Sequence, residues 1–217
     1  MVQTENTGKI FEKAVCLLYN TPYIGKYKYD LETPHKLAER LVRLKTLFPD
    51  CIHSAKNGSR YDFTSTDGTE QHLSAKTTKK DGKVAPQVIG QAKPQKFCEL
   101  TGLTFTDIPT LKRDIQENIQ KILAVLFGYT FDCPIVYYNQ HRDTILFVKA
   151  REHQPDWSAF EYSWTKLHES WNGSTTLKVG SVPVAEFQFH SKSRTNMAIR
   201  WNFEDVIKLL KLDVELL

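Results

Sequence analysis

A β-hairpin signal in the first third of the chain most strongly constrains how this sequence can fold. Residues 60–66 and 69–77 are rich in β-branched and aromatic side chains, and Asp67-Gly68 lies between them. An Asp-Gly pair between two such runs is a strong indication of a tight turn joining antiparallel strands. The sequence therefore predicts two neighbouring strands here.

The length of the turn decides which residues of the two strands face each other. A two-residue turn would place Tyr61 opposite Ser74, whereas a three-residue loop over residues 67–69 would place Asp62 opposite Ser74. Ser74 and Lys76 share one face in either case, because side chains alternate along a strand. We predict the three-residue loop, with Asp62 on the face of Ser74 and Lys76.

Helical and strand periodicities alternate along the rest of the chain. Helices are predicted at residues 7–19, at 34–48 with Thr33 as N-cap, at 109–127 with Asp107 as N-cap, and from about Asn202 onward. Further strands are predicted at residues 135–138, 144–149, 175–179, 184–190 and 197–203. Residues 78–96 are interpreted as a long irregular segment, and residues 157–171 fit no regular element. This order predicts a mixed α/β (α+β) domain with a central mixed sheet flanked by helices.

Composition and spacing exclude several classes of protein. The 217 residues are 41% hydrophobic and 25% charged, with a net charge of +4 and no apolar run long enough for a membrane helix. No signal peptide is recognisable, and Cys16, Cys51, Cys98 and Cys133 lie too far apart for a zinc site. No glycine-rich phosphate loop is present, so no nucleotide cofactor is expected. We expect a cytoplasmic protein with reduced thiols and no membrane partner.

The predicted strand pair brings together the groups that phosphodiester hydrolysis requires. That reaction needs a divalent cation held by carboxylate oxygens and a positive group beside the developing charge on the phosphate. Asp62 can supply the carboxylate and Lys76 the ammonium group.

This pattern resembles the PD-(D/E)xK nuclease superfamily and, within it, the type II restriction endonucleases. The resemblance rests on Asp62, the thirteen residues before Lys76, the Ser74-Ala75-Lys76 motif and the leading helical segment 8–12. It covers about the first 95 residues. In that family the aspartate binds magnesium, the lysine assists the attacking water, and a glutamate of the early helix adds an acidic contact. The resemblance assigns these roles to Asp62, Lys76 and Glu12.

The sequence departs from the family at Ser74, where the family has an acid. A hydroxyl binds a hard cation more weakly than a carboxylate does, so another acid is expected to contribute. Glu12 is the first candidate, although a plain surface role fits it too, and Glu70 and Glu99 are the others. The predicted catalytic residues are therefore Asp62, Lys76, Ser74 and Glu12, with Asp62, Glu12 and Ser74 at the metal.

The resemblance implies a type II site-specific deoxyribonuclease that hydrolyses double-stranded DNA with Mg²⁺ in a restriction-modification system. A homodimer is expected, since cutting two strands with one site per chain favours twofold symmetry. We expect residues 1–217 to form a single nuclease domain, with a catalytic half (1–96) and a half for DNA recognition (97–217).

Sequence-specific cutting also requires side chains that reach base edges and phosphates. Arginine and lysine suit guanine, whereas asparagine and glutamine suit adenine. The predicted DNA contacts are Lys56, Asn57, Arg60, Lys79, Lys80, Gln87, Gln91, Gln188, His190, Lys192, Arg194, Asn196 and Arg200.

Two other functions are compatible with the same residues. A nicking endonuclease of the mismatch-repair type shares the core motif and a similar length. A sequence-specific DNA-binding protein without catalysis is the second alternative, because Ser74 replaces an expected acid. Cleavage of both strands without a helper protein would exclude both.

Overall fold

The computed structural model describes residues 4–56, 59–80, 82–189 and 197–217. The chain folds as two compact units that interleave in the sequence. The first unit comprises Met1–Gly82, Cys133–Ala150 and Leu212–Leu217, and the second comprises Lys83–Asp132 and Arg151–Lys211. Each unit has its own β-sheet. The units are thus not consecutive halves, and a functional division near residue 96 stays a prediction.

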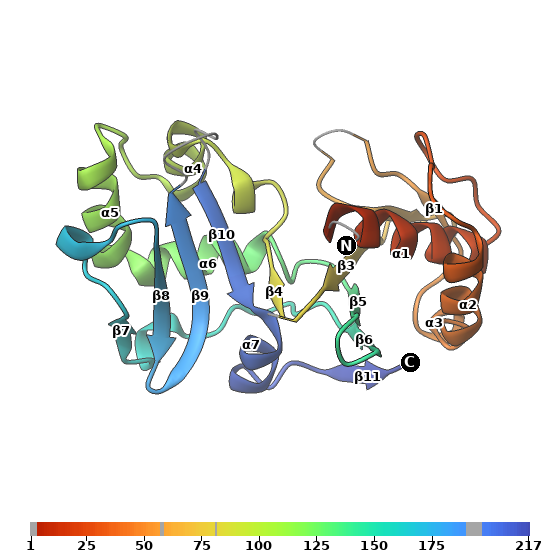
Figure 1. Cartoon of the computed structure of the whole chain (residues 1–217). Helices are drawn as coiled ribbons and strands as arrows, with labels where there is room; N and C mark the ends of the chain where they lie inside the picture. Colours follow the sequence, from red (N-terminus) through yellow and green to blue (C-terminus); the bar gives the residue numbers. More distant parts are fainter. Residues whose placement is uncertain (1–3, 57–58, 81, 190–196) are drawn as a thin grey trace. The chain divides into compact units, whose positions relative to one another are not determined.

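The first unit is built on a six-stranded mixed sheet (Figure 1). Its strands follow the order β1-β2-β3-β5-β6-β11, in which β3 and β5 are parallel and the other neighbours are antiparallel. Their bounds are β1 Cys51–His53, β2 Phe63–Ser65, β3 His72–Thr78, β5 Ile135–Asn139, β6 Thr144–Val148 and β11 Val214–Leu216. The helices are α1 Thr4–Leu18, α2 Glu32–Arg40 and α3 Leu44–Leu47. The expected mixed sheet with helices is confirmed.

The apolar stripe of α1 packs on one face of this sheet. Phe11 shares a buried hydrophobic cluster with Leu73 and Ala75 of β3. Ser74 and Lys76 alternate with these core residues, so their side chains leave the opposite side of the strand. The packing of α1 therefore determines which face of β3 carries the motif residues.

In its described residues, the second unit contains a five-stranded antiparallel sheet and four α-helices. The strand order is β4-β10-β9-β8-β7, with β4 Lys83–Val84, β7 Tyr162–Trp164, β8 Ser174–Val179, β9 Val182–Phe189 and β10 Met197–Asn202. The helices are α4 Pro94–Thr101, α5 Ile108–Glu117, α6 Ile119–Gly128 and α7 Phe203–Leu209, with short 3₁₀ turns η1 Ile89–Gln91, η2 Trp157–Ala159 and η3 His168–Ser170. Large aromatic side chains fill its core, and the indole nitrogen of the buried Trp201 donates to the Thr130 hydroxyl at 2.8 Å.

Both long helices predicted from periodicity are interrupted. The helix predicted over residues 34–48 is divided into α2 and α3. At the break, the Leu44 amide donates a hydrogen bond to the Leu41 carbonyl at 2.8 Å. Thr33 does not cap α2, which begins at Glu32, and the Asp30 carboxylate accepts the Thr33 amide at 2.8 Å instead. The predicted cap at Thr33 is therefore wrong.

The stripe over residues 109–127 is likewise divided at Asn118 into α5 and α6. The predicted N-cap is confirmed, because Asp107 accepts the Thr110 amide at 2.7 Å. An apolar stripe continues across a short break, so periodicity alone does not reveal such a kink.

Several short elements have no counterpart among the elements that the sequence predicted. Strands β1, β4, β7 and β11 and helix α4 were not predicted. Each of these strands has two or three residues, too few to show an alternating pattern. They form because neighbouring strands supply hydrogen-bond partners, which is a property of the tertiary fold.

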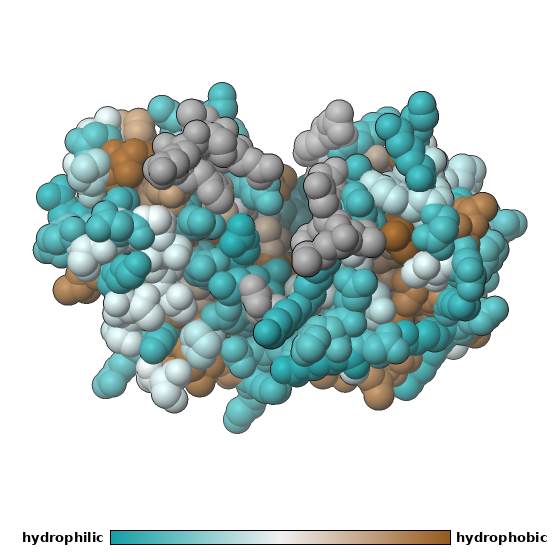
Figure 2. Space-filling model, in the orientation of Figure 1, coloured by the Kyte–Doolittle hydropathy of each residue, from teal (hydrophilic) through white to brown (hydrophobic). Residues whose placement is uncertain are grey.

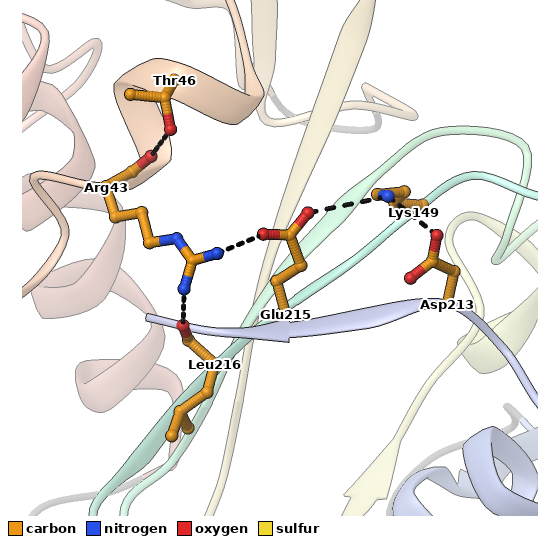
Figure 3. A network of polar contacts seen from close by, with 6 residues as sticks. All are labelled: Arg43, Thr46, Lys149, Asp213, Glu215 and Leu216. Atoms are coloured by element: carbon orange, nitrogen blue, oxygen red, sulfur yellow. Dashed lines mark hydrogen bonds and ion pairs between the residues drawn. The ribbon is translucent and has the colours of Figure 1, made fainter.

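A charged network holds the C-terminal strand β11 on the first unit (Figure 3). Arg43, which precedes α3, donates to the Glu215 carboxylate at 2.7 Å and to the Leu216 carbonyl at 3.2 Å. Lys149 bonds Asp213 at 2.7 Å and lies 3.6 Å from the other oxygen of Glu215. The Arg43 contact also occupies a carbonyl on the outer edge of the sheet, where free edge groups invite pairing with other chains.

Hydrophilic residues cover most of the face shown in Figure 2. Across the described ranges, none of the helices combines the length and the apolarity that a membrane crossing demands.

Candidate active site

Asp62 and Lys76 lie side by side in the first unit. The Lys76 Nζ is 3.4 Å from the Asp62 Oδ2, and the two side chains are 21% and 18% exposed. Both groups are thus close enough to act together and accessible to a ligand. The structure confirms that they share one side of the strand pair.

The hairpin register explains this placement. Phe63 lies opposite Leu73, so continuing the ladder by one residue sets Asp62 opposite Ser74. This register leaves residues 67–69 as the loop between opposed positions, as the sequence analysis predicted. Gly68 adopts a φ of +83°, a region that glycine enters without steric cost.

A backbone amide of β3 holds the Asp62 carboxylate in place, one residue before β2 begins. The Ser74 amide bonds Pro134, on the β5 side of the strand, at 3.0 Å. The next amide, of Ala75, points to the β2 side of the strand, just beyond Phe63, the first residue of β2. The Asp62 Oδ2 takes the place of a backbone acceptor and receives this amide at 2.8 Å. The carboxylate is therefore held in place before any ligand binds.

Glu12 belongs to a neighbouring cluster formed by α1, β1 and the loop after α1. Its Oε2 is 3.4 Å from the Nε2 of His53, whose side chain is 1% exposed. Tyr23 lies close to Glu12, and burial together with this nearby carboxylate raises the pKa of the Tyr23 phenol. Tyr23 therefore stays protonated beside the carboxylate.

The tautomer of His53 follows from its other contact. The Ile24 amide donates to His53 Nδ1 at 2.8 Å, so Nδ1 carries a lone pair and the proton of the neutral ring is on Nε2. Nε2 lies 3.4 Å from Glu12 Oε2 but forms no well-aligned hydrogen bond with it. Sequence reasoning did not single out His53, because nothing in its sequence neighbourhood indicates a buried histidine beside a carboxylate.

Backbone contacts join the two clusters. His53 lies opposite Phe63 in the β1–β2 ladder, and the Ser54 amide donates to the Asp62 carbonyl at 2.9 Å. The described partners of Glu12, however, are His53 and Tyr23, and those of the Asp62 carboxylate are Ala75 and Lys76. Nowhere in the described ranges do three or more His, Cys, Asp or Glu side chains form a metal-binding group.

The other residues considered for the metal site are less well placed. The Ser74 hydroxyl belongs to a fully buried residue. Glu70 is exposed in the hairpin turn, at the far end of β2 from Asp62. Glu99 lies on α4, in the second unit, and pairs with Lys96 at 2.8 Å. Of Glu12, Glu70 and Glu99, Glu12 is the one whose partner, His53, lies on the strand next to β2.

A stack of polar aromatic groups lies beside Asp62. The Tyr61 and His72 rings are parallel, with centroids 4.0 Å apart, and the Arg60 guanidinium lies 5.5 Å from the Tyr61 ring. His72 also contacts the Thr64 hydroxyl at 3.2 Å. The stack orders the chain that leads into Asp62.

The predicted DNA contacts are placed unevenly. Lys56, Lys80 and Gln91 are exposed, Arg60, Lys79, Gln188 and Arg200 are half-buried, and Gln87 is buried at 7% exposed. Asn57, His190, Lys192, Arg194 and Asn196 lie outside the described residues. Base reading needs an accessible side chain, so the structure offers no support for Gln87 in that role.

Arg200 is engaged within the second unit. Its guanidinium donates to Glu186 at 3.1 Å, and Lys83 contacts the other oxygen of the same carboxylate at 3.2 Å. One carboxylate thus offsets part of the positive charge of both cations.

The sequence was also compared with known proteins. No family model matches it, and no solved structure matches it significantly. It is 44% identical over 209 residues to the type II restriction enzyme CviAII of Paramecium bursaria Chlorella virus 1. The alignment covers 95% of this chain and 60% of that enzyme, so the chain spans about three fifths of its relative. The expected resemblance is confirmed, while the PD-(D/E)xK superfamily stays a prediction. Over nearly its whole length, the chain is similar to a type II restriction enzyme.

Proposed function

We propose that this protein is a Mg²⁺-dependent endonuclease that hydrolyses phosphodiester bonds of double-stranded DNA at specific sites. The observation that carries the proposal is the Asp62–Lys76 pair, 3.4 Å apart, with the Asp62 carboxylate already oriented by the Ala75 amide. Similarity to a type II restriction enzyme supports the same chemistry.

The donor groups fit a hard divalent cation. Mg²⁺ is commonly bound through one or two carboxylates together with water and substrate phosphates, and Asp62 provides one partly exposed carboxylate. When bound, the cation would polarise the scissile phosphate and offset its developing charge. We assign Asp62 as the principal ligand. Ser74 remains a predicted ligand, although its hydroxyl is buried.

Lys76 has a separate role in this proposal. Its ammonium group lies next to the carboxylate that would hold the metal, and its side chain is 21% exposed. A positive charge there stabilises the negative charge that builds up on the phosphate and favours deprotonation of the attacking water. The contact with Asp62 orients the flexible lysine side chain.

Glu12 is proposed as the acid that compensates for Ser74. Its carboxylate is 20% exposed and is held by His53 and Tyr23. We assign Glu12 to the acidic set because the family resemblance implies it, whereas its partner His53 lies on the face of the sheet that α1 covers. A homodimer, a restriction-modification setting and a cytoplasmic location complete the proposal.

Cleavage of plasmid DNA tests this function. Purified protein should cut both strands in Mg²⁺ but not in EDTA, and mapped fragment ends should share one sequence. The variants Asp62→Asn and Lys76→Met should lose at least 100-fold of the single-turnover rate, or about 2.7 kcal/mol of transition-state stabilisation, while binding DNA in Ca²⁺. Lys45→Met, an exposed lysine of α3, is the matched control and should cut normally.

Other outcomes would favour the alternatives. Binding without cleavage by the wild-type protein would indicate a non-catalytic DNA-binding protein. Nicks in one strand only would indicate a nicking endonuclease. Unimpaired cutting by either Asp62→Asn or Lys76→Met would remove the proposed site.

A further inference from the structure

The loop between α1 and α2, which can be followed in Figure 1, has an alternating basic and aromatic sequence. Residues 26–29 read Lys-Tyr-Lys-Tyr. Lys26 and Lys28 are exposed, whereas Tyr27 and Tyr29 are half-buried. The extended segment thus presents its two lysines to solvent and packs its two tyrosines inward, as expected from the alternation of side chains.

The tyrosines give this loop a defined structure. The Tyr27 ring contacts the Tyr23 and Tyr29 rings edge-on, at centroid distances of 5.6 and 5.4 Å. The Tyr27 hydroxyl donates to the Asp30 carbonyl at 2.8 Å, and the Tyr29 hydroxyl donates to Asn6 at 3.0 Å. The lysines therefore stand on an ordered support.

The loop carries a concentration of positive charge. Within the described ranges, neither Lys26 nor Lys28 forms an ion pair, and Lys13 of α1 lies 6.0 Å from the Tyr27 ring centroid. Burial raises the pKa of Tyr27 to about 12, so its phenol is neutral. Two residues of extended chain span about 6.6 Å, so the two exposed ammonium groups can reach separate phosphates of one DNA strand.

The loop is also attached to the Glu12 cluster. The Tyr23 ring stacks on His53 at 4.6 Å, Tyr23 lies close enough to Glu12 for that carboxylate to raise its pKa, and the Ile24 amide bonds His53 Nδ1. The same short segment thus touches the proposed catalytic acid and ends in the exposed lysines.

We propose that Lys26 and Lys28, supported by Tyr27 and Tyr29, bind the sugar-phosphate backbone of duplex DNA beside the cut site. The inference rests on the proposed function, because it concerns the same duplex DNA. It names the phosphate backbone as the part of that DNA that the loop binds. Phosphate contacts position a duplex without reading its sequence. The loop would therefore contribute affinity on every DNA sequence.

The salt dependence of binding tests the inference. Each lost phosphate contact makes the plot of log Kobs against log salt concentration less steep by about 0.9. The double variant Lys26→Gln, Lys28→Gln should therefore reduce the slope by about 1.8, equally on cognate and non-cognate duplexes. Binding is measured in Ca²⁺, so that the result does not depend on cleavage.

Two controls separate charge from structure. The variant Lys26→Arg, Lys28→Arg keeps both charges and should keep the wild-type slope. The variant Lys36→Gln, Lys45→Gln removes two exposed lysines of α2 and α3 and should leave the slope unchanged. Far-UV circular dichroism of the loop variant should match the wild type, because both lysines are exposed.

Failure of this inference is distinguishable from failure of the proposed function. A wild-type protein that binds and cuts DNA, together with an unchanged slope in the glutamine loop variant, would overturn the inference alone. An equal loss of slope in the α2 and α3 control would do the same. A wild-type protein that binds no DNA would overturn both.

Discussion

The Nε2 of His53 lies 3.4 Å from the Oε2 of Glu12, and the Nδ1 of the same ring accepts the Ile24 amide at 2.8 Å. The first distance exceeds the ~2.9 Å of a well-formed hydrogen bond, so the contact is electrostatic and orients the carboxylate weakly. The second contact determines the tautomer. A buried imidazole thus links the helix that carries Glu12 to the strand next to β2.

Replacing His53 should destabilise the first unit. His53→Ala leaves the partly buried Ile24 amide without its acceptor and removes the ring that packs against Tyr23 and Phe63. We expect the free energy of unfolding to fall by about 2–4 kcal/mol in urea titrations. The exposed His141 is the control, and its alanine variant should stay within about 0.5 kcal/mol of wild type. A His53→Ala protein as stable as the control would contradict the assigned contacts.

Two substitutions at Asp62 should separate its structural contact from its charge. Asp62→Asn keeps an oxygen acceptor for the Ala75 amide, whereas Asp62→Ala leaves that amide unpaired. Because the site is partly exposed, the alanine variant should be less stable than the asparagine variant by about 1 kcal/mol. Urea denaturation measures the difference, while both variants should be inactive under the proposed function. Equal stabilities would show that the 2.8 Å contact contributes nothing.

Buried thiols should make stability depend on pH in alkaline solution. Burial raises the pKa values of Cys16 and Cys51 to about 12 from an ordinary 9.0. The unfolded chain loses these protons first, so their contribution to stability is complete below pH 9.0 and is lost as pH rises toward 12. The variant Cys16→Ala, Cys51→Ala should show a shallower loss of stability over this range. A loss as steep as that of the wild type would contradict the assigned pKa values.

The same pKa values predict that the two thiols are unreactive in the folded protein. Only the thiolate attacks disulfide reagents, and both side chains are buried. At pH 8 a disulfide reagent should label Cys16 and Cys51 only after denaturant is added. Rapid labelling of either residue in buffer alone, located by mass spectrometry, would refute the prediction.

Loss of Arg43 should loosen the C-terminal strand without unfolding the protein. Arg43→Ala removes the contacts to Glu215 and to the Leu216 carbonyl, while the Leu217 amide keeps its bond to Ile145. Hydrogen exchange at the Leu217 amide should become faster, and global stability should fall by no more than about 1 kcal/mol. Lys36→Ala, which breaks the exposed pair with Glu32, is the control and should leave that amide unchanged. Equal protection in both variants would mean that the network does not hold β11.

The pairing of Asp62 with Lys76 could be predicted from the sequence because it depends on local rules. A turn signal and the alternation of side chains are properties of consecutive residues, and together they predicted the register that the structure shows. The N-cap at Asp107 followed from the same kind of local chemistry. Glu12 was named through a family resemblance, but its partners His53 and Tyr23 were not.

What the sequence determined by itself is therefore the strand pair and the chemical groups that it brings together. Tertiary structure decided the division into interleaved units, the breaks in the two long helices, and the short strands such as β1, which place His53 beside Glu12. These features depend on contacts between residues far apart in the chain. A stretch of three residues gains its conformation from the partners that a neighbouring strand supplies, and no local pattern encodes those partners.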